Sequence, residues 1–347
     1  MLTTGKRKFL FWLSVVIFLA MIPVVILYAL GYRLDDNWRL QKTGGIYITT
    51  DVPGSEIFLD GELERRTNLL QNGIFIDNLS PGNYEIAVLN QKYLPWQKKL
   101  KVASQLVTEA RALLVPAQTN ARILFQGKFS NIFSSTEDPL FVLGEEKNSE
   151  KIIRWYLPER EEFLTDTGAL LKYKNDFEII RWLSGGAILK IDGAAARVRF
   201  NIGAKTVTRI ALGDEGVSKT EEEVKEALER IDNSDFIKVS YAPEEKILRA
   251  SWIGKTIRPY YFSSDEEILL ENKEIRNFEL YPGRRDAVLA SFDNGIWAIE
   301  IDGRDSRIIS PIYKGREPNF ALVDGESDVF IFDDGILMRA SLLAKEQ

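Results

Sequence analysis

The feature that most constrains this chain is a continuous apolar run from Phe9 to Leu30, which follows the basic cluster Lys6-Arg7-Lys8. The run contains no charged residue, and its only departures from apolar character are Ser14 and Pro23. At about 1.5 Å per residue it would form a helix of roughly 33 Å, enough to cross a hydrocarbon core of about 30 Å. We therefore predict that residues 9–30 form a transmembrane helix.

A cleaved signal peptide is the alternative, because it also begins with basic residues. Its apolar core is usually about 7–15 residues long and ends in small residues. The run in this chain is longer, and it ends in Tyr28-Ala29-Leu30-Gly31-Tyr32. We therefore favour an uncleaved anchor.

The positive-inside rule alone does not decide the orientation of the anchor, because equal numbers of basic residues flank its two ends. Three basic residues precede the run, and three follow it, Arg33, Arg39 and Lys42. The first three are denser, and an eight-residue basic tail resists export. We expect a cytoplasmic tail over residues 1–8, the helix over 9–30, a linker over 31–43 and the rest of the chain outside the cytoplasm.

Composition excludes several classes of function. The net charge of −6 argues against nucleic acid as a partner. The chain contains no His and no Cys, which removes histidine acid–base catalysis, Ser-His-Asp triads, disulfides and the usual zinc sites. We expect no cofactor and no metal.

Residues 44–116 read as five or six short strands separated by turns, which predicts a small β-sandwich. The pair Asp60-Gly61 is a strong hairpin signal. The segments Val52-Pro53-Gly54-Ser55-Glu56-Ile57-Phe58-Leu59-Asp60-Gly61, Leu79-Ser80-Pro81-Gly82-Asn83-Tyr84 and Lys92-Tyr93 follow in order. In these segments the stretch resembles the PEGA domain family, which implies an exported β module without catalytic residues. It departs from the family at Ser55, where Ala is usual, and at Thr67-Asn68, where Thr-Pro is common.

The cluster Tyr93-Leu94-Pro95-Trp96 is the one part of this stretch that could present aromatic side chains to a ligand. Packing in the core or at a sheet edge is the plainer interpretation. We keep Tyr93 and Trp96 as candidate ligand-facing residues.

Residues 121–347 show a repeat. Turns after aromatic-bearing strands, at Glu137, Gly185, Glu244, Gly283 and Gly325, are separated by 48, 59, 39 and 42 residues. Periods near 40–45 with four strands each are typical of propeller blades. The pattern resembles TolB-like and WD40-like repeats and predicts a β-propeller of about five blades, so the fold class is all-β behind a single helix. A ring of six blades, one of them degenerate, is the alternative.

Two segments depart from the repeat. The fifth unit runs out of chain after its third strand, and Arg122-Ile123-Leu124-Phe125 has no blade of its own. We predict that this segment closes the ring by pairing with the last blade. Residues 218–231 carry a capping box and apolar residues at helical spacing, which predicts a helical insertion that either packs on the surface or docks a partner.

Carboxylates are the only candidates for catalysis. Asp176, Asp235 and Glu279 lie on or near the first strands of their units and could face the central channel. Paired carboxylates of a glycosidase lie about 5–9 Å apart. Solvation at strand ends is the plainer interpretation of all three.

Together these observations predict a membrane-anchored, extracytoplasmic binding or scaffold protein of the cell envelope without catalytic activity. Its partner would be a protein or a cell-wall glycan. The alternatives are an envelope glycosidase that uses channel carboxylates and an accessory subunit of an envelope complex.

Overall fold

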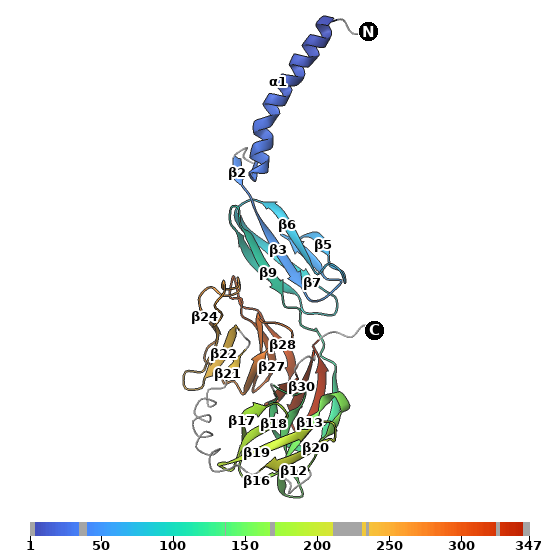
Figure 1. Ribbon diagram of the computed structural model, residues 1–347, viewed down its shortest axis with the longest axis vertical. Coiled ribbons are helices and arrows are strands. Elements are labelled where there is room, and N and C mark those ends of the chain that lie inside the picture. Colours follow the sequence, from blue (N-terminus) through green and yellow to red (C-terminus); the bar gives the residue numbers. More distant parts are fainter. Residues whose placement is uncertain are drawn as a thin grey trace. The chain divides into compact units, whose positions relative to one another are not determined.

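A computed structural model describes residues 4–34, 40–135, 137–166, 171–210, 231–233, 236–323 and 327–342. The chain divides into two compact units. The first contains Met1–Asn90 and Pro95–Leu114, and the second contains Gln91–Leu94 and Val115–Gln347. Figure 1 shows the first unit in blue to teal and the sheets of the second in green to red.

Helix α1 (Thr4–Ala29) opens the first unit. Its segment Phe9–Ala29 is the one helix among the described residues that is long and apolar enough to cross a membrane. The helix ends where Gly31 takes a left-handed backbone conformation (φ 79°), which suits a residue without Cβ. The Arg33 guanidinium donates to the carbonyl of Tyr28 at 2.9 Å and lies over the Tyr28 ring, so a cation stabilises the helix C-terminus.

The segment predicted as a linker contains a small hairpin. Strand β1 (Tyr32–Leu34) pairs antiparallel with β2 (Leu40–Lys42). The hairpin is tied to the turn at residues 80–81, because the Gln41 amide donates to Ser80 Oγ at 2.6 Å.

Seven strands form two sheets in the rest of the first unit. They are β3 (Gly44–Thr50), β4 (Glu56–Leu59), β5 (Glu62–Arg66), β6 (Gly73–Leu79), β7 (Gly82–Leu89), β8 (Trp96–Val102) and β9 (Val107–Ala112). One sheet has the order β6-β3-β9 and the other β5-β4-β7-β8. The predicted hairpin at Asp60-Gly61 is present, with both residues at positive φ. The pairing of β3 with β9 is parallel, and hairpin signals do not predict it.

Ser55, one departure from the PEGA pattern, contacts Thr67, the residue before the other departure, Asn68. Ser55 and Thr67 are both buried, and the Ser55 N–H donates to Thr67 Oγ1 at 2.9 Å. The Ser55 hydroxyl in turn donates to the carbonyl of Val52. The polar groups at these positions therefore satisfy one another beneath the turn.

The described residues of the second unit form five sheets, an arrangement typical of a β-propeller. The first sheet contains β11 (Lys128–Ser134), β12 (Phe141–Lys147), β13 (Glu150–Leu157) and β14 (Glu162–Phe163). The second sheet contains β17 (Phe177–Leu183), β18 (Gly186–Ile191), β19 (Ala194–Asn201) and β20 (Thr206–Ile210). The short strand β16 (Lys172–Tyr173) pairs with β13 of the first sheet, and β15 (Thr165–Asp166) pairs with β20 of the second.

The next two sheets are four-stranded. The third sheet contains β21 (Ile231–Asn233), β22 (Ile237–Ala242), β23 (Ile247–Trp252) and β24 (Glu266–Leu270). The fourth contains β25 (Asn277–Leu280), β26 (Ala287–Phe292), β27 (Gly295–Glu300) and β28 (Ile309–Lys314). Ile231, predicted as the end of a helical insertion, begins strand β21 instead. The rest of the predicted insertion, residues 218–230, lies outside the described residues.

The last sheet has the order β10-β31-β30-β29 and unites the two ends of the second unit. Strand β10 (Ala121–Gln126) pairs antiparallel with β31 (Ile336–Ser341), beside β30 (Asp328–Asp333) and β29 (Asn319–Leu322). The prediction that 122–125 adds to the last blade is confirmed. Side chains of this sheet, including Phe330 and Leu337, share a core with Phe141 and Tyr156 of the first sheet.

Candidate functional site

The innermost strands of three sheets meet at Ser134, the last residue of β11. Its hydroxyl donates to Glu279 Oε1 of β25 at 2.7 Å and accepts the N–H of Leu322 at the end of β29, at 2.8 Å. A further bond joins the same strands, from the amide of buried Asn277 to the carbonyl of Phe320 at 2.7 Å. We call Ser134, Glu279, Asn277 and their backbone partners the axial node. Within it the Glu279 carboxylate links sheets to one another.

Asp176 lies immediately before β17 and is exposed. Its carboxylate accepts the side-chain amide of Asn131 at 2.6 Å and its neighbour's N–H, that of Phe177, at 2.8 Å. Asn131 and Ser134 are three residues apart on β11, a spacing of about 10 Å along a strand. The carboxylates of Asp176 and Glu279 therefore contact separate residues of β11. The third candidate, Asp235, lies outside the described residues.

The aromatic cluster does not form one exposed surface. Trp96 is only 1% exposed and belongs to the core of the first unit. Tyr93 belongs to the second unit, is half-buried and forms a backbone bridge with Pro116. The alternation of strand β8 explains the burial of Trp96, since Leu100 and Val102 lie on the same face.

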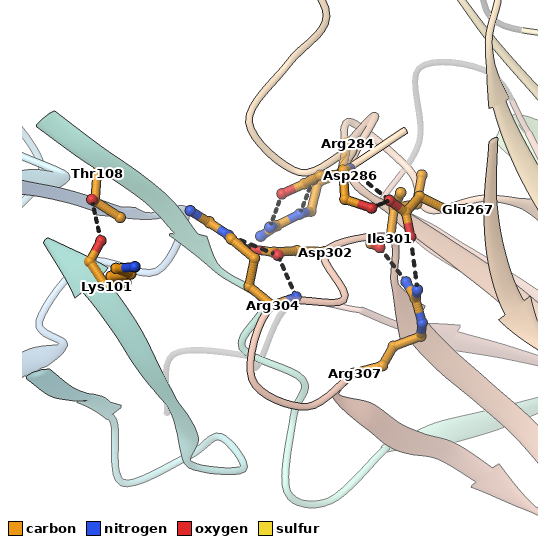
Figure 2. Close-up of polar contacts among 10 residues, drawn as sticks. Lys101, Thr108, Glu267, Arg284, Asp286, Ile301, Asp302, Arg304 and Arg307 are labelled. Carbon is orange, nitrogen blue, oxygen red and sulfur yellow. Dashed lines mark hydrogen bonds and ion pairs between the residues drawn. The ribbon is translucent and has the colours of Figure 1, made fainter. Parts of the chain in front are cut away.

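A cluster of buried charges lies between and beside strands β24 to β28, and no pattern considered above predicts it. Its centre is the pair Arg284 and Asp286, both 6% exposed and joined by two bonds, Nε to Oδ1 at 2.9 Å and Nη2 to Oδ2 at 2.6 Å. A second pair, Arg304 and Asp302, has the same two-pronged geometry (Figure 2). Both pairs are two residues apart in sequence and follow a strand end, and this is the signal that could have found them.

Arg307 completes this charged cluster. Its guanidinium donates to the carbonyls of Glu300 and Ile301 and lies 3.4 Å from Glu267 (Figure 2). Burial lowers the pKa of Arg307 and is partly offset by Glu267. Burial raises the pKa of Glu267, but hydrogen bonds from Ser263 and the charge of Arg307 outweigh it, so the net pKa is lowered. Glu267 therefore stays ionised at neutral pH.

Tyr260 lies against the same cluster. Burial raises its pKa, and the nearby carboxylates of Asp286 and Asp302 raise it further. The Arg304 guanidinium lies 4.9 Å from the centre of its ring. The phenol therefore stays neutral, and the cations of this cluster are each matched by a carboxylate. Among the described residues, no group of three acidic side chains is placed to hold a metal ion.

No protein-family model and no curated protein matches the chain. Solved structures similar to it include Kluyveromyces lactis Hsv2, at 7% identity over 87% of this chain and 76% of that chain, with a TM-score of 0.24. An auxiliary nutrient binding protein from Bacteroides thetaiotaomicron has 8% identity over 83% and 78%, with a TM-score of 0.23. The β-propeller domain of Myceliophteria thermophila Cps50 (Swd1) has 12% identity over 76% and 84%, with a TM-score of 0.20. A likeness this distant carries no functional argument, and the assignment of a propeller is based on the strand pairings above.

Proposed function

We propose that the protein is a single-pass membrane protein whose β units lie outside the cytoplasm and act as a non-catalytic binding or scaffold platform of the cell envelope. The exposed apolar surface of α1 supports the anchor, since such a helix needs a bilayer or a partner to cover it. The resemblance of residues 44–116 to the PEGA family supports an exported location. In this proposal the first unit is a spacer or a second contact, and the second unit presents the larger surface.

The axial node is the observation that supports a platform over an enzyme. A glycosidase needs one carboxyl group that donates a proton and a second that attacks or activates water. Here Glu279 accepts a bond from Ser134, and Asp176 accepts bonds from Asn131 and the backbone. Both described candidates thus have structural partners, on different residues of β11.

A hydrolysis assay tests the non-catalytic part of this proposal. Detergent-solubilised full-length protein is incubated with purified cell-wall glycan, and newly formed reducing ends are measured. We expect no release above the level without protein. Release that both Asp176→Asn and Glu279→Gln abolish would contradict the proposal and establish the glycosidase alternative.

A further inference from the structure

A short hairpin folds back along the end of the apolar helix. Strand β1 follows α1 after a turn at Gly31, whose positive φ of 79° lets the chain reverse. Arg33 of β1 then donates to the carbonyl of Tyr28, five residues earlier, and its guanidinium lies 3.6 Å from the centre of the Tyr28 ring. Figure 1 shows β2, the partner of β1, next to the end of α1. We call strands β1 and β2 the return hairpin.

The length of α1 places the return hairpin at the surface of a bilayer. The segment Phe9–Ala29 has 21 residues and is about 31 Å long, which matches a hydrocarbon core of about 30 Å. The headgroup layer adds about 5–7 Å on each side of that core. Each strand of the hairpin has three residues and spans about 7 Å. A hairpin of this length that returns along the end of α1 therefore stays within the headgroup layer.

The side chains at this end of the helix suit the boundary between acyl chains and phosphates. Tyr28 is 62% exposed, and Leu40, the first residue of β2, is 54% exposed. A cation lies on each of two tyrosine rings: Arg33 on Tyr28, and Lys42, whose Nζ is 5.3 Å from the centre of the Tyr32 ring. Tyrosine is enriched at this depth, and a basic side chain there can rest its stem on apolar surface while its charge reaches the phosphates.

The sequence between the two strands limits how deep the hairpin can lie. Asp35 and Asp36 stand in this connection, which is outside the described residues. An ionised carboxylate is costly in hydrocarbon and is tolerated where water is present. The hydrated headgroup layer, and not the hydrocarbon core, is therefore the part of a bilayer that fits this segment.

Hydrogen bonds connect the return hairpin to the β-sandwich that follows it. Thr43, the residue after β2, donates its N–H to the carbonyl of Gly31 at 3.1 Å. The Thr43 carbonyl accepts the N–H of Gln105, in the turn between β8 and β9, at 2.9 Å. Lys42 Nζ also donates to Gln105 Oε1 at 3.0 Å. Any surface that holds the hairpin therefore also holds this end of the sandwich.

We infer that the return hairpin binds the phospholipid headgroup layer of the bilayer that α1 crosses. Arg33 and Lys42 contact phosphate oxygens, and Leu40 lies against the upper ends of the acyl chains. The hairpin then fixes the first unit at the membrane surface, so that α1 is not a loose tether. This binding deepens the proposed function and rests on its membrane anchor, and the experiment below separates the two.

The test uses full-length protein reconstituted in phosphatidylcholine vesicles, in which part of the lipid carries a nitroxide on its headgroup. Since the natural chain has no Cys, a single Leu40→Cys is labelled with bimane, whose fluorescence a nearby nitroxide quenches. The control is Leu70→Cys, at a fully exposed leucine two residues before Asn72. The Asn72 carbonyl accepts the N–H of Thr50, which ends β3 about 20 Å from Gly44. We expect quenching at position 40 and none at position 70.

A second labelled position keeps the test valid if Leu40→Cys disturbs the hairpin. Leu106→Cys replaces a 61% exposed residue of the turn that is bonded to Thr43 through Gln105. Its label should be quenched less than the label at position 40 and more than the label at position 70. Quenching at positions 40 and 106 that does not exceed quenching at position 70 would overturn the inference.

Flotation of the vesicles separates this inference from the anchor. Protein that does not float with the vesicles would contradict the anchor and the inference together. Protein that floats without quenching at position 40 would overturn the inference alone. A label at position 40 whose emission is shifted to the blue without quenching would also overturn it, because another protein surface, such as a second copy of the chain, would then cover the hairpin.

Discussion

The hydroxyl of Ser134 donates a hydrogen bond of 2.7 Å to the carboxylate of Glu279, which lies 145 positions later in the chain. Because the same hydroxyl accepts the Leu322 N–H, one small side chain connects three sheets of the second unit. Such a contact stabilises a ring of sheets only when all three are in place. It also explains why an acidic residue is found on an innermost strand without invoking catalysis.

Ser134→Ala should destabilise the second unit by about 2 kcal/mol, because it removes both bonds and leaves the Leu322 N–H without this partner. Urea unfolding of the full-length protein measures the effect. Ser306→Ala is the matched control, since Ser306 is exposed, and it should change stability by less than about 0.5 kcal/mol. Equal stability of Ser134→Ala and the control would show that the axial node contributes nothing.

Arg284→Ala should cost about 3–5 kcal/mol, because it leaves the buried carboxylate of Asp286 without its two-pronged partner. Replacing both residues together, as Arg284→Met with Asp286→Leu, should be much less damaging, since no uncompensated charge is then buried. Thermal unfolding of the three proteins makes the comparison. If the double variant is as unstable as the single one, the pair is required for its specific shape and not only for charge balance.

An engineered disulfide tests the ring closure. Ala121 of β10 and Ala340 of β31 are direct strand partners, and the natural chain has no Cys to compete. Ala121→Cys with Ala340→Cys should form a disulfide under mild oxidation and stabilise the second unit by about 2–4 kcal/mol. A change in electrophoretic mobility on reduction reports the bond.

The control pair for this disulfide is Ala121→Cys with Ser341→Cys, in which the second side chain points to the opposite face of the sheet. It should stay reduced under the same conditions. Oxidation of the control in preference to the Ala340 pair would mean that the register of β10 on β31 is shifted by one residue.

Glu267 should make the second unit more stable at neutral than at acid pH. Its pKa in the folded protein is below the ordinary value of 4.5, so the folded state favours the ionised form. The resulting stabilisation is present above pH 4.5 and is lost as the pH falls through the lowered pKa of the folded state. Glu267→Gln should therefore be less stable than the parent protein at pH 7, by about 2 kcal/mol.

Below pH 4 the difference between Glu267→Gln and the parent protein should shrink, because the parent carboxyl is then increasingly protonated. Urea unfolding of both proteins at several pH values follows this difference. If the difference in unfolding free energy between the two proteins does not change with pH, the Ser263 and Arg307 contacts do not act through the charge of Glu267.

Local patterns predicted much of this fold. The apolar run predicted α1, and the turn Asp60-Gly61 predicted the hairpin of β4 and β5. The second strand of each sheet in the second unit follows its predicted turn, and the position of Arg122 to Phe125 predicted the closing strand. Each of these features depends on residues close in sequence or on a regular repeat.

Apart from this closing strand, contacts between distant segments could not be predicted in this way. The parallel pairing of β3 with β9 joins strands that no short turn connects. The Ser134–Glu279 bond depends on how the sheets are arranged around the ring, which no spacing in the sequence encodes. Burial of Trp96 follows from the register of β8, and one residue of shift would have exposed it.

The sidedness of the two ends of α1 tests the proposed topology most directly, and it is measured with a membrane-impermeant maleimide on intact cells. The natural chain has no Cys, so a single Leu70→Cys, at a fully exposed position, and a single Gly5→Cys, before the apolar run, each report one side. We predict that Leu70→Cys is labelled in intact cells and that Gly5→Cys is labelled only after permeabilisation. Labelling of Gly5→Cys with protection of Leu70→Cys would contradict it.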